Sequence, residues 1–212
     1  MILTVDIGNT IIAVGGFEGD MLAFVVRLAT NIKETSHEYA AKLDSILRLS
    51  DTETHSLTAA VISSVVPQLT GTIREALKIA FGIDALSVGP GVKTGINIHC
   101  DDPSSVGADL ICVSVAAAKK YGSPCIIVDM GTATKIIHLG KNGTFEGVAI
   151  LPGAEISLSA LADRTAQLPH IALTAPDSAI GKNTIDSMRS GAVFGAAAAV
   201  DGMIDRFFFE IG

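Results

Sequence analysis

Two short segments of this sequence place an aspartate, a glycine and small polar side chains in the same order. Residues 5–10 read VDIGNT and residues 128–134 read VDMGTAT, and each begins in apolar residues typical of a buried strand. The glycine allows backbone N–H groups to approach phosphate oxygens, and the amide and hydroxyl side chains add neutral donors. A carboxylate at the end of such a strand is suited to hold Mg²⁺, directly or through water. Both segments therefore indicate phosphate binding.

An ordinary hairpin turn is the alternative for the first segment alone, since Gly-Asn is common in such turns. One copy does not decide between the two interpretations. The second copy, with Asp129, Gly131 and Thr132, favours the functional one. Because each copy is followed by another β-type run, we expect two related halves that face each other across a cleft.

A third candidate is the sequence Gly107-Ala108-Asp109, which we expect at the start of a helix. An aspartate in a first helical turn is often only a surface charge that complements the helix dipole. Close to a phosphate site, the same carboxylate can orient or deprotonate a substrate hydroxyl, as phosphoryl transfer requires. The position of Asp109 in the sequence leaves both interpretations open.

Strands and helices alternate along the chain and must position these residues. Apolar and β-branched runs predict a strand meander over residues 1–30 and further strands at 57–66, 86–88, 125–129, 134–140 and 144–153. Apolar residues at helical spacing predict helices at 37–49, 67–81, 104–121, 154–162 and 186–209. The pattern predicts an α/β fold with mixed sheets, and we place a domain boundary near Ser114.

The composition excludes several functional classes. A formal net charge of −7 and a pI near 5.1 argue against nucleic-acid binding. Hydrophobic residues make up 49% of the chain and charged residues 17%, which excludes a disordered protein. No apolar stretch reaches the roughly 18 residues of a membrane span, and the N-terminus lacks the basic region of a signal peptide. We therefore expect a cytoplasmic protein with no membrane partner.

The cysteines and histidines do not follow metal-site spacings. Cys100, Cys112 and Cys125 form no CxxC pair, which favours reduced thiols over a disulfide or a metal site. The five histidines show no HxxxH spacing, which argues against zinc catalysis; they are His37, His55, His99, His138 and His170.

Taken together, these segments resemble the bacterial type III pantothenate kinases. The matching motifs, in chain order, are DIGNT at 6–10, SSVVP at 63–67, VGPGVKTGINI at 88–98, GAD at 107–109, VDMGTAT at 128–134, LPG at 151–153, AQLP at 166–169, IGKNT at 180–184 and SG at 190–191. The motifs are collinear and span almost the whole chain. The ordered set is therefore specific, although no single motif is decisive.

The resemblance implies a fold of two duplicated ribonuclease H-like domains, as in actin-like ATPases, with mixed sheets and an inter-domain cleft. The N-terminal subdomain would cover residues 1–114, and the C-terminal subdomain residues 115–212, without the family's final segment near the nucleotide. The implied activity is ATP-dependent phosphorylation of pantothenate to 4′-phosphopantothenate, the first step of coenzyme A synthesis. A cytoplasmic homodimer would perform it, with Mg²⁺ and with K⁺ or NH₄⁺.

The resemblance also implies roles for individual residues. The ATP phosphates would be wrapped by Asp6, Ile7, Gly8, Asn9 and Thr10, with Asp6 toward Mg²⁺ through water. Asp109 would accept the proton of the pantothenate hydroxyl and contact pantothenate together with Gly107, Ala108 and Thr184. Asp129 would bind the monovalent cation and Thr132 the nucleotide. The γ-phosphoryl group would then pass in line to a primary hydroxyl, with catalysis resting on positioning and on electrostatic shielding.

This sequence departs from the family pattern at several positions near the expected site. Leu110 stands where an Arg usually follows Gly-x-Asp, so a guanidinium that could pair with the pantothenate carboxylate is lost. Cys100 replaces a Tyr of the substrate pocket, Lys135 replaces a Thr after the second turn, and Val148 replaces a Gly. Lys135 and Arg164 are candidate replacements for the lost Arg.

Two alternatives to a pantothenate kinase stay open from the sequence. The first is a non-catalytic or regulatory relative, and the second is a related kinase for another small hydroxyl compound. The substrate-pocket departures favour these alternatives, whereas the three retained carboxylates, Asp6, Asp109 and Asp129, favour the enzyme. Small residues in the stretch 187–200 predict close helix packing, either on a dimer partner or within the chain.

Overall fold

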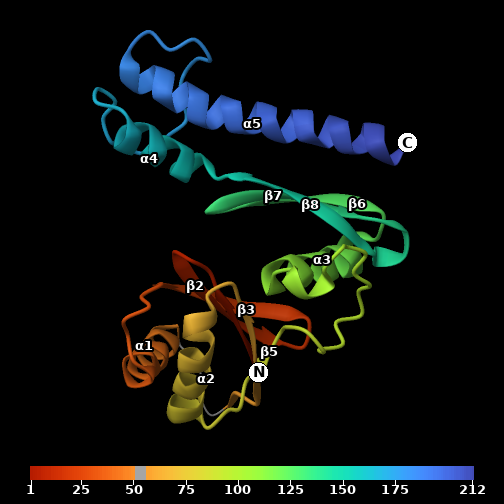
Figure 1. The fold of residues 1–212 in the computed structure, drawn as a ribbon. Coiled ribbons are helices and arrows are strands. Elements are labelled where there is room, and N and C mark those ends of the chain that lie inside the picture. Colours follow the sequence, from red (N-terminus) through yellow and green to blue (C-terminus); the bar gives the residue numbers. More distant parts are fainter. Residues whose placement is uncertain (51–55) are drawn as a thin grey trace. The chain divides into compact units, whose positions relative to one another are not determined.

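The structure is a computed structural model that describes residues 1–50 and 56–212, so His55 lies outside the described residues. The chain divides into two compact units. Unit 1 comprises Met1–Gly95 and Asp102–Val113, and unit 2 comprises Ile96–Asp101 and Ser114–Gly212. Figure 1 follows the elements of both units along the chain.

Unit 1 is built on a five-stranded sheet of order β3-β2-β1-β4-β5. Its strands are β1 (Ile2–Ile7), β2 (Ile11–Glu18), β3 (Met21–Ala29), β4 (Ala59–Ser64) and β5 (Leu86–Ser87). The first three strands form an antiparallel meander, as the sequence predicts, while β4 pairs in parallel with β1, and β5 with β4. Parallel neighbours need a crossover connection, and helices supply it here.

The helices α1 (Ser36–Leu49) and α2 (Pro67–Phe81) make these crossovers and contact each other. A capping box opens α1: the Glu38 carboxylate accepts from the Thr35 N–H at 2.7 Å, and the Thr35 hydroxyl accepts from the Glu38 N–H at 3.4 Å. Pro67 occupies the first turn of α2, where its missing N–H costs nothing. The apolar faces of both helices join those of β1, β2 and β4 in one core, whose fully buried members include Leu3, Ile12, Tyr39, Leu43, Ile62, Ile73 and Leu77.

The helix expected at residues 104–121 begins later than the sequence predicts. Residues Pro103–Ser105 form a separate 3₁₀ turn, and α3 covers Ala108–Tyr121. The Asp102 carboxylate accepts from the Ser104 N–H at 3.0 Å, which satisfies the short turn, and Val106 is extended. The chain enters α3 only at Gly107, whose carbonyl accepts the Ile111 N–H at 3.2 Å.

Unit 2 contains a three-stranded antiparallel sheet of order β6-β7-β8, formed by β6 (Cys125–Met130), β7 (Ala133–Leu139) and β8 (Phe145–Pro152). A 3₁₀ turn at Lys141–Gly143 joins β7 to β8. Two further helices, α4 (Ala154–Arg164) and α5 (Thr184–Ile211), contact each other through Leu158, Met188 and Ala192 (Figure 1). The predicted strands and helices of this half are confirmed, with ends that differ by a few residues.

The sequence repeat corresponds to a structural repeat. Each Asp-x-Gly segment is the turn of an antiparallel hairpin, β1–β2 in unit 1 and β6–β7 in unit 2. The strand, tight turn and second strand predicted from the two copies are thereby confirmed. Among the described helices, none combines the length and the hydropathy needed to cross a membrane.

Candidate active site

The turn between β1 and β2 is held in shape by hydrogen bonds from its own backbone and from the end of β3. The Gly8 N–H donates to the Ile11 carbonyl at 3.0 Å. The Thr30 hydroxyl donates to the Gly8 carbonyl at 2.7 Å, and the Thr30 N–H donates to the Thr10 carbonyl at 2.9 Å. Asn9 and Thr10 remain exposed on this braced turn. Their side chains are therefore accessible to a ligand without a rearrangement of the backbone.

Asp6, at the end of β1, has one carboxylate oxygen fixed by the neighbouring strand. Asp6 lies opposite Ser63 in the parallel β1–β4 register. The Ser63 hydroxyl donates to Asp6 Oδ1 at 3.0 Å, and Ser63 is 8% exposed while Asp6 is exposed. A buried hydroxyl therefore orients a carboxylate that faces solvent.

Asp109 and Asp6 belong to the same unit, and the charges of both act on the thiol of Cys112. Cys112, one turn further along α3, forms a hydrogen bond with Ser63. Burial raises the pKa of the Cys112 thiol, and the negative charges of Asp6 and Asp109 add to the rise, while the Ser63 hydrogen bond opposes it. Gly107 is the residue that makes room for the carboxylate, since a Cβ there would lie 2.5 Å from Asp109 Oδ1. Unit 1 thus contains both carboxylates expected to act on phosphate and on a hydroxyl.

The second turn, between β6 and β7, packs against the start of α4. The Gly131 N–H donates to the Ala133 carbonyl at 3.2 Å, and the Gly153 N–H donates to the Thr132 carbonyl at 3.1 Å. A Cβ at Gly153 would collide with the Gly131 carbonyl oxygen and lie 2.6 Å from that of Thr132. The LPG segment at the end of β8 therefore needs its glycine for close approach to the turn.

Asp129, at the end of β6, forms an ion pair with Lys135 on β7. Lys135 Nζ lies 2.7 Å from Asp129 Oδ2, and the two residues are directly opposed in the hairpin register. Their side chains are 20% and 37% exposed, respectively. The lysine considered as a substitute for the lost Arg is thus bonded to the carboxylate expected to hold a monovalent cation.

The remaining expected site residues lie at the starts of helices. Ala108 is the first residue of α3 and is buried, whereas Thr184 is the first residue of α5 and is exposed. Asn183 caps α5, since its side chain accepts the Asp186 N–H at 2.9 Å. Leu110, in place of the family's Arg, is 7% exposed. The side chain at position 110 is therefore buried in this structure.

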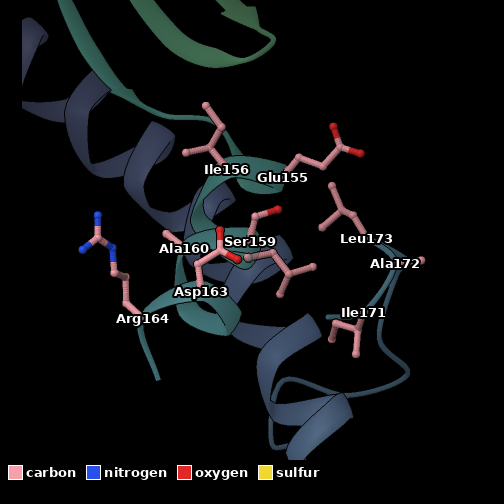
Figure 2. A pocket seen from close by; sticks show the side chains of 10 residues that line it. Glu155, Ile156, Ser159, Ala160, Asp163, Arg164, Ile171, Ala172 and Leu173 are labelled. Carbon is pink, nitrogen blue, oxygen red and sulfur yellow. The ribbon is translucent and has the colours of Figure 1, made fainter. Parts of the chain in front are cut away.

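A cavity of about 680 Å³ lies in unit 2 between α4 and residues 171–173 (Figure 2). Its lining combines charged side chains of α4 with apolar ones from both segments, among them Glu155, Asp163, Arg164, Ile171 and Leu173. None of the expected site residues belongs to the described lining. Arg164, the second candidate for the lost Arg, is part of this cavity instead.

Three residues that contact the site were not assigned roles from the sequence: Thr30, Ser63 and Gly153. Ser63 and Gly153 lie in the SSVVP and LPG motifs, so a signal was present, but their roles depend on contacts between strands. Thr30 directly follows β3 and lies outside any motif, so the sequence gives no signal for its contact with the first turn.

The donor atoms around Asp6 are suited to Mg²⁺. A carboxylate and a hydroxyl present only oxygen ligands, and Mg²⁺ in phosphoryl-transfer sites takes one or two carboxylates together with substrate phosphates. Within residues 1–50 and 56–212, no group of three or more His, Cys, Asp or Glu side chains could enclose a metal by itself. The residues therefore fit a metal that is completed by a nucleotide.

The strand orders and the repeated hairpin define a mixed α/β protein of two units, each of which carries one copy of the Asp-x-Gly hairpin. The sequence profile of the type III pantothenate kinases matches residues 2–206. The type III pantothenate kinase of Shouchella clausii is 42% identical over 207 residues, which cover 97% of this chain and 81% of that protein. That of Exiguobacterium sp. is 41% identical over 212 residues, 100% of this chain and 84% of the relative. The chain belongs to the type III pantothenate kinase family, which confirms the resemblance seen in the sequence.

Solved structures share the fold at low sequence identity. A conserved Baf-family protein from Campylobacter jejuni matches with a TM-score of 0.51 and 19% identity, covering 94% of this chain and 78% of that one. The activator of 2-hydroxyisocaproyl-CoA dehydratase from Clostridium difficile, solved with bound ADPNP, matches with a TM-score of 0.50 and 11% identity. That match covers 100% of this chain and 76% of the activator. Both similarities concern the fold alone.

Proposed function

We propose that this chain transfers the γ-phosphoryl group of ATP to pantothenate and forms 4′-phosphopantothenate, the first step of coenzyme A synthesis. Membership of the type III pantothenate kinase family over nearly the whole chain supports this function. The observation that carries it is in unit 1, where Ser63 orients Asp6 and where the charges of Asp6 and Asp109 both act on the thiol of Cys112.

In this proposal the first turn binds the phosphates of ATP. Backbone N–H groups of this turn other than that of Gly8, together with the side chains of Asn9 and Thr10, donate to phosphate oxygens, and the bonds from Thr30 hold the turn in that shape. Asp6, oriented by Ser63, would hold Mg²⁺ directly or through water. When bound, the metal supplies positive charge that shields the phosphate oxygens.

Asp109 is the proposed proton acceptor. Its carboxylate takes the proton of the primary hydroxyl of pantothenate as the oxygen attacks the γ-phosphorus, and the bond from that phosphorus to the β-phosphate oxygen breaks to release ADP. Gly107 leaves space beside the carboxylate, and Ala108 together with Thr184 would contact pantothenate. The rate enhancement then comes mainly from positioning and electrostatics.

The second turn is proposed to contribute Thr132 to nucleotide binding. The resemblance also implies K⁺ or NH₄⁺ at Asp129, but that carboxylate is 2.7 Å from the Lys135 ammonium. A second cation does not fit well beside it, so the mechanism proposed here has no step through such an ion.

Three further features complete the proposal. We assign residues 1–114 and 115–212 to the two actin-like subdomains, supported by the hairpin repeated in each half. A homodimer and a cytoplasmic location follow from the family resemblance and from the need for ATP and pantothenate in one compartment. Light scattering of the purified chain tests the dimer: a mass of one chain would contradict it.

Mass spectrometry of the product tests the acceptor directly. The purified chain is incubated with Mg-ATP and an equimolar mixture of pantothenate and other small primary alcohols, and each acceptor is examined for an added phosphoryl group. We expect phosphopantothenate as the main product. Phosphorylation of another alcohol in preference to pantothenate would favour a related kinase, and no phosphorylated acceptor would favour a non-catalytic relative.

A further inference from the structure

The β6–β7 hairpin builds an ion pair into the second Asp-x-Gly turn. Asp129 and Lys135 are directly opposed in the antiparallel register, so their side chains leave the sheet on the same face. Lys135 Nζ donates to Asp129 Oδ2 at 2.7 Å. The hairpin itself therefore keeps the ammonium close to the carboxylate, because the register sets the spacing of the two backbones.

Partial burial strengthens this pair relative to an ion pair on an open surface. The Lys135 and Asp129 side chains are 20% and 37% exposed. Solvent and salt screen such a pair less than two fully exposed charges. Lys135 also lies on the central strand β7, between Asp129 on β6 and Ile150 on β8, so strands on both sides restrict its side chain.

A monovalent cation at the same carboxylate would meet an unfavourable environment. The ammonium already neutralises the charge of Asp129, and a second positive charge within a few ångströms would be repelled by it. The residues at this turn therefore do not fit K⁺ or NH₄⁺.

We propose that the Lys135 ammonium supplies, as a permanent part of the chain, the positive charge that the resemblance assigns to a monovalent cation at Asp129. The protein then binds no K⁺ or NH₄⁺ at this turn and needs neither for activity. The activity part of this inference rests on the proposed function, whereas the binding part does not. The family pattern has a threonine at this position, so the substitution Lys135→Thr removes the ammonium and restores the family residue.

Kinase activity in different chloride salts tests the inference. Wild type, Lys135→Thr and Lys141→Thr are assayed in KCl, NH₄Cl, NaCl and choline chloride at one ionic strength. We expect wild-type kcat/KM to change by less than about twofold among the salts. Lys135→Thr should become activated by K⁺ or NH₄⁺ by about tenfold, an ordinary size for coupling between two sites. Lys141→Thr removes an equal charge from an exposed turn and should behave like wild type.

Thermal unfolding in the same salts gives a second readout that needs no activity. A ligand that binds only the folded state raises the unfolding temperature. We expect equal unfolding temperatures for wild type in K⁺ and Na⁺, and a K⁺-specific increase for Lys135→Thr. If wild type shows no kinase activity in any salt, the proposed function fails, and the unfolding data still decide the inference.

Three results would overturn the inference. The first is activation of wild type by K⁺, or a K⁺-specific increase in its unfolding temperature. The second is a Lys135→Thr protein as active as wild type without K⁺, since the ammonium would then be dispensable. The third is a folded Lys135→Thr protein that K⁺ affects in neither assay, since Lys135 would then not stand in the place of an ion.

Discussion

Replacement of Ser63 by alanine tests whether the β1–β4 register orients Asp6 for its function. The Ser63 hydroxyl donates to Asp6 Oδ1 at 3.0 Å, and Ser63 is 8% exposed. Ser63→Ala removes this hydrogen bond and weakens the orientation of the Asp6 carboxylate. The expected effect is a loss of activity with little loss of stability, because the exposed carboxylate can be hydrated in the variant.

The size of the effect follows from the chemistry of the bond. A hydrogen bond to a charged group contributes about 1.5–3 kcal/mol. Water can reach the exposed Asp6 and replace part of the lost hydrogen-bond energy, so the expected loss lies at the lower end of this range of energies. Since about 1.4 kcal/mol corresponds to a tenfold change in rate, Ser63→Ala should lower kcat/KM for ATP by about tenfold.

Steady-state kinetics with Ser64→Ala as the matched control provide the assay. Ser64 is the next residue of β4, but its hydroxyl accepts the Val66 N–H at 3.1 Å and so supports the start of α2. Ser64→Ala should therefore lower the unfolding temperature and change kcat/KM by less than about twofold. Wild-type kinetics in Ser63→Ala, or equal losses of activity in both variants, would refute the role assigned to Ser63.

Three further predictions concern the close packing at Gly153, the ionisation of Cys112 and the buried core around Ile62. Gly153→Ala should destabilise the chain by about 1–3 kcal/mol in urea unfolding, because the new methyl group would overlap the carbonyl of Thr132. Gly191→Ala is the control, because a Cβ at Gly191 would meet open space. Equal stability of the two variants would contradict the close packing at Gly153. Alkylation of Cys112 by iodoacetamide should be slow at neutral pH and accelerate only at pH values above the usual pKa of a thiol, because the pKa of Cys112 is raised and the thiolate is the reactive form. Peptide mass spectrometry measures the labelling. Rapid labelling at neutral pH would show that the pKa of Cys112 is lowered instead. Ile62→Ala should cost about 2–5 kcal/mol in the same unfolding experiment, since Ile62 is fully buried on β4, and a cost near zero would contradict the assigned core.

Local patterns predicted most of the fold because each element carries its own signal. The meander of residues 1–30 follows from short β-branched runs separated by turn residues, and α2 follows from Pro67 and its apolar spacing. The predicted start of α3 was wrong because the sequence does not reveal that the Asp102 carboxylate closes a separate turn with Ser104. A local side-chain bond there competes with the helix.

The expected site residues could be named from the motifs, whereas their partners depend on pairing between distant segments. Ser63 contacts Asp6 only because β4 pairs with β1 in one particular register. The Asp129–Lys135 pair is more local, and a count across the second turn would place the two residues opposite each other in a tight hairpin. The cavity beside α4 involves residues 171–173, which carry no periodic pattern that could have indicated it.

ADP release by the purified chain, measured with Mg-ATP in the presence and absence of pantothenate, tests the central claim most directly. Wild type should release ADP only when pantothenate is present. Asp109→Asn should lower the pantothenate-dependent rate by about a hundredfold or more, the usual contribution of a general base, while its unfolding temperature stays close to that of wild type. ADP release that does not depend on pantothenate, or an Asp109→Asn variant as active as wild type, would contradict the account.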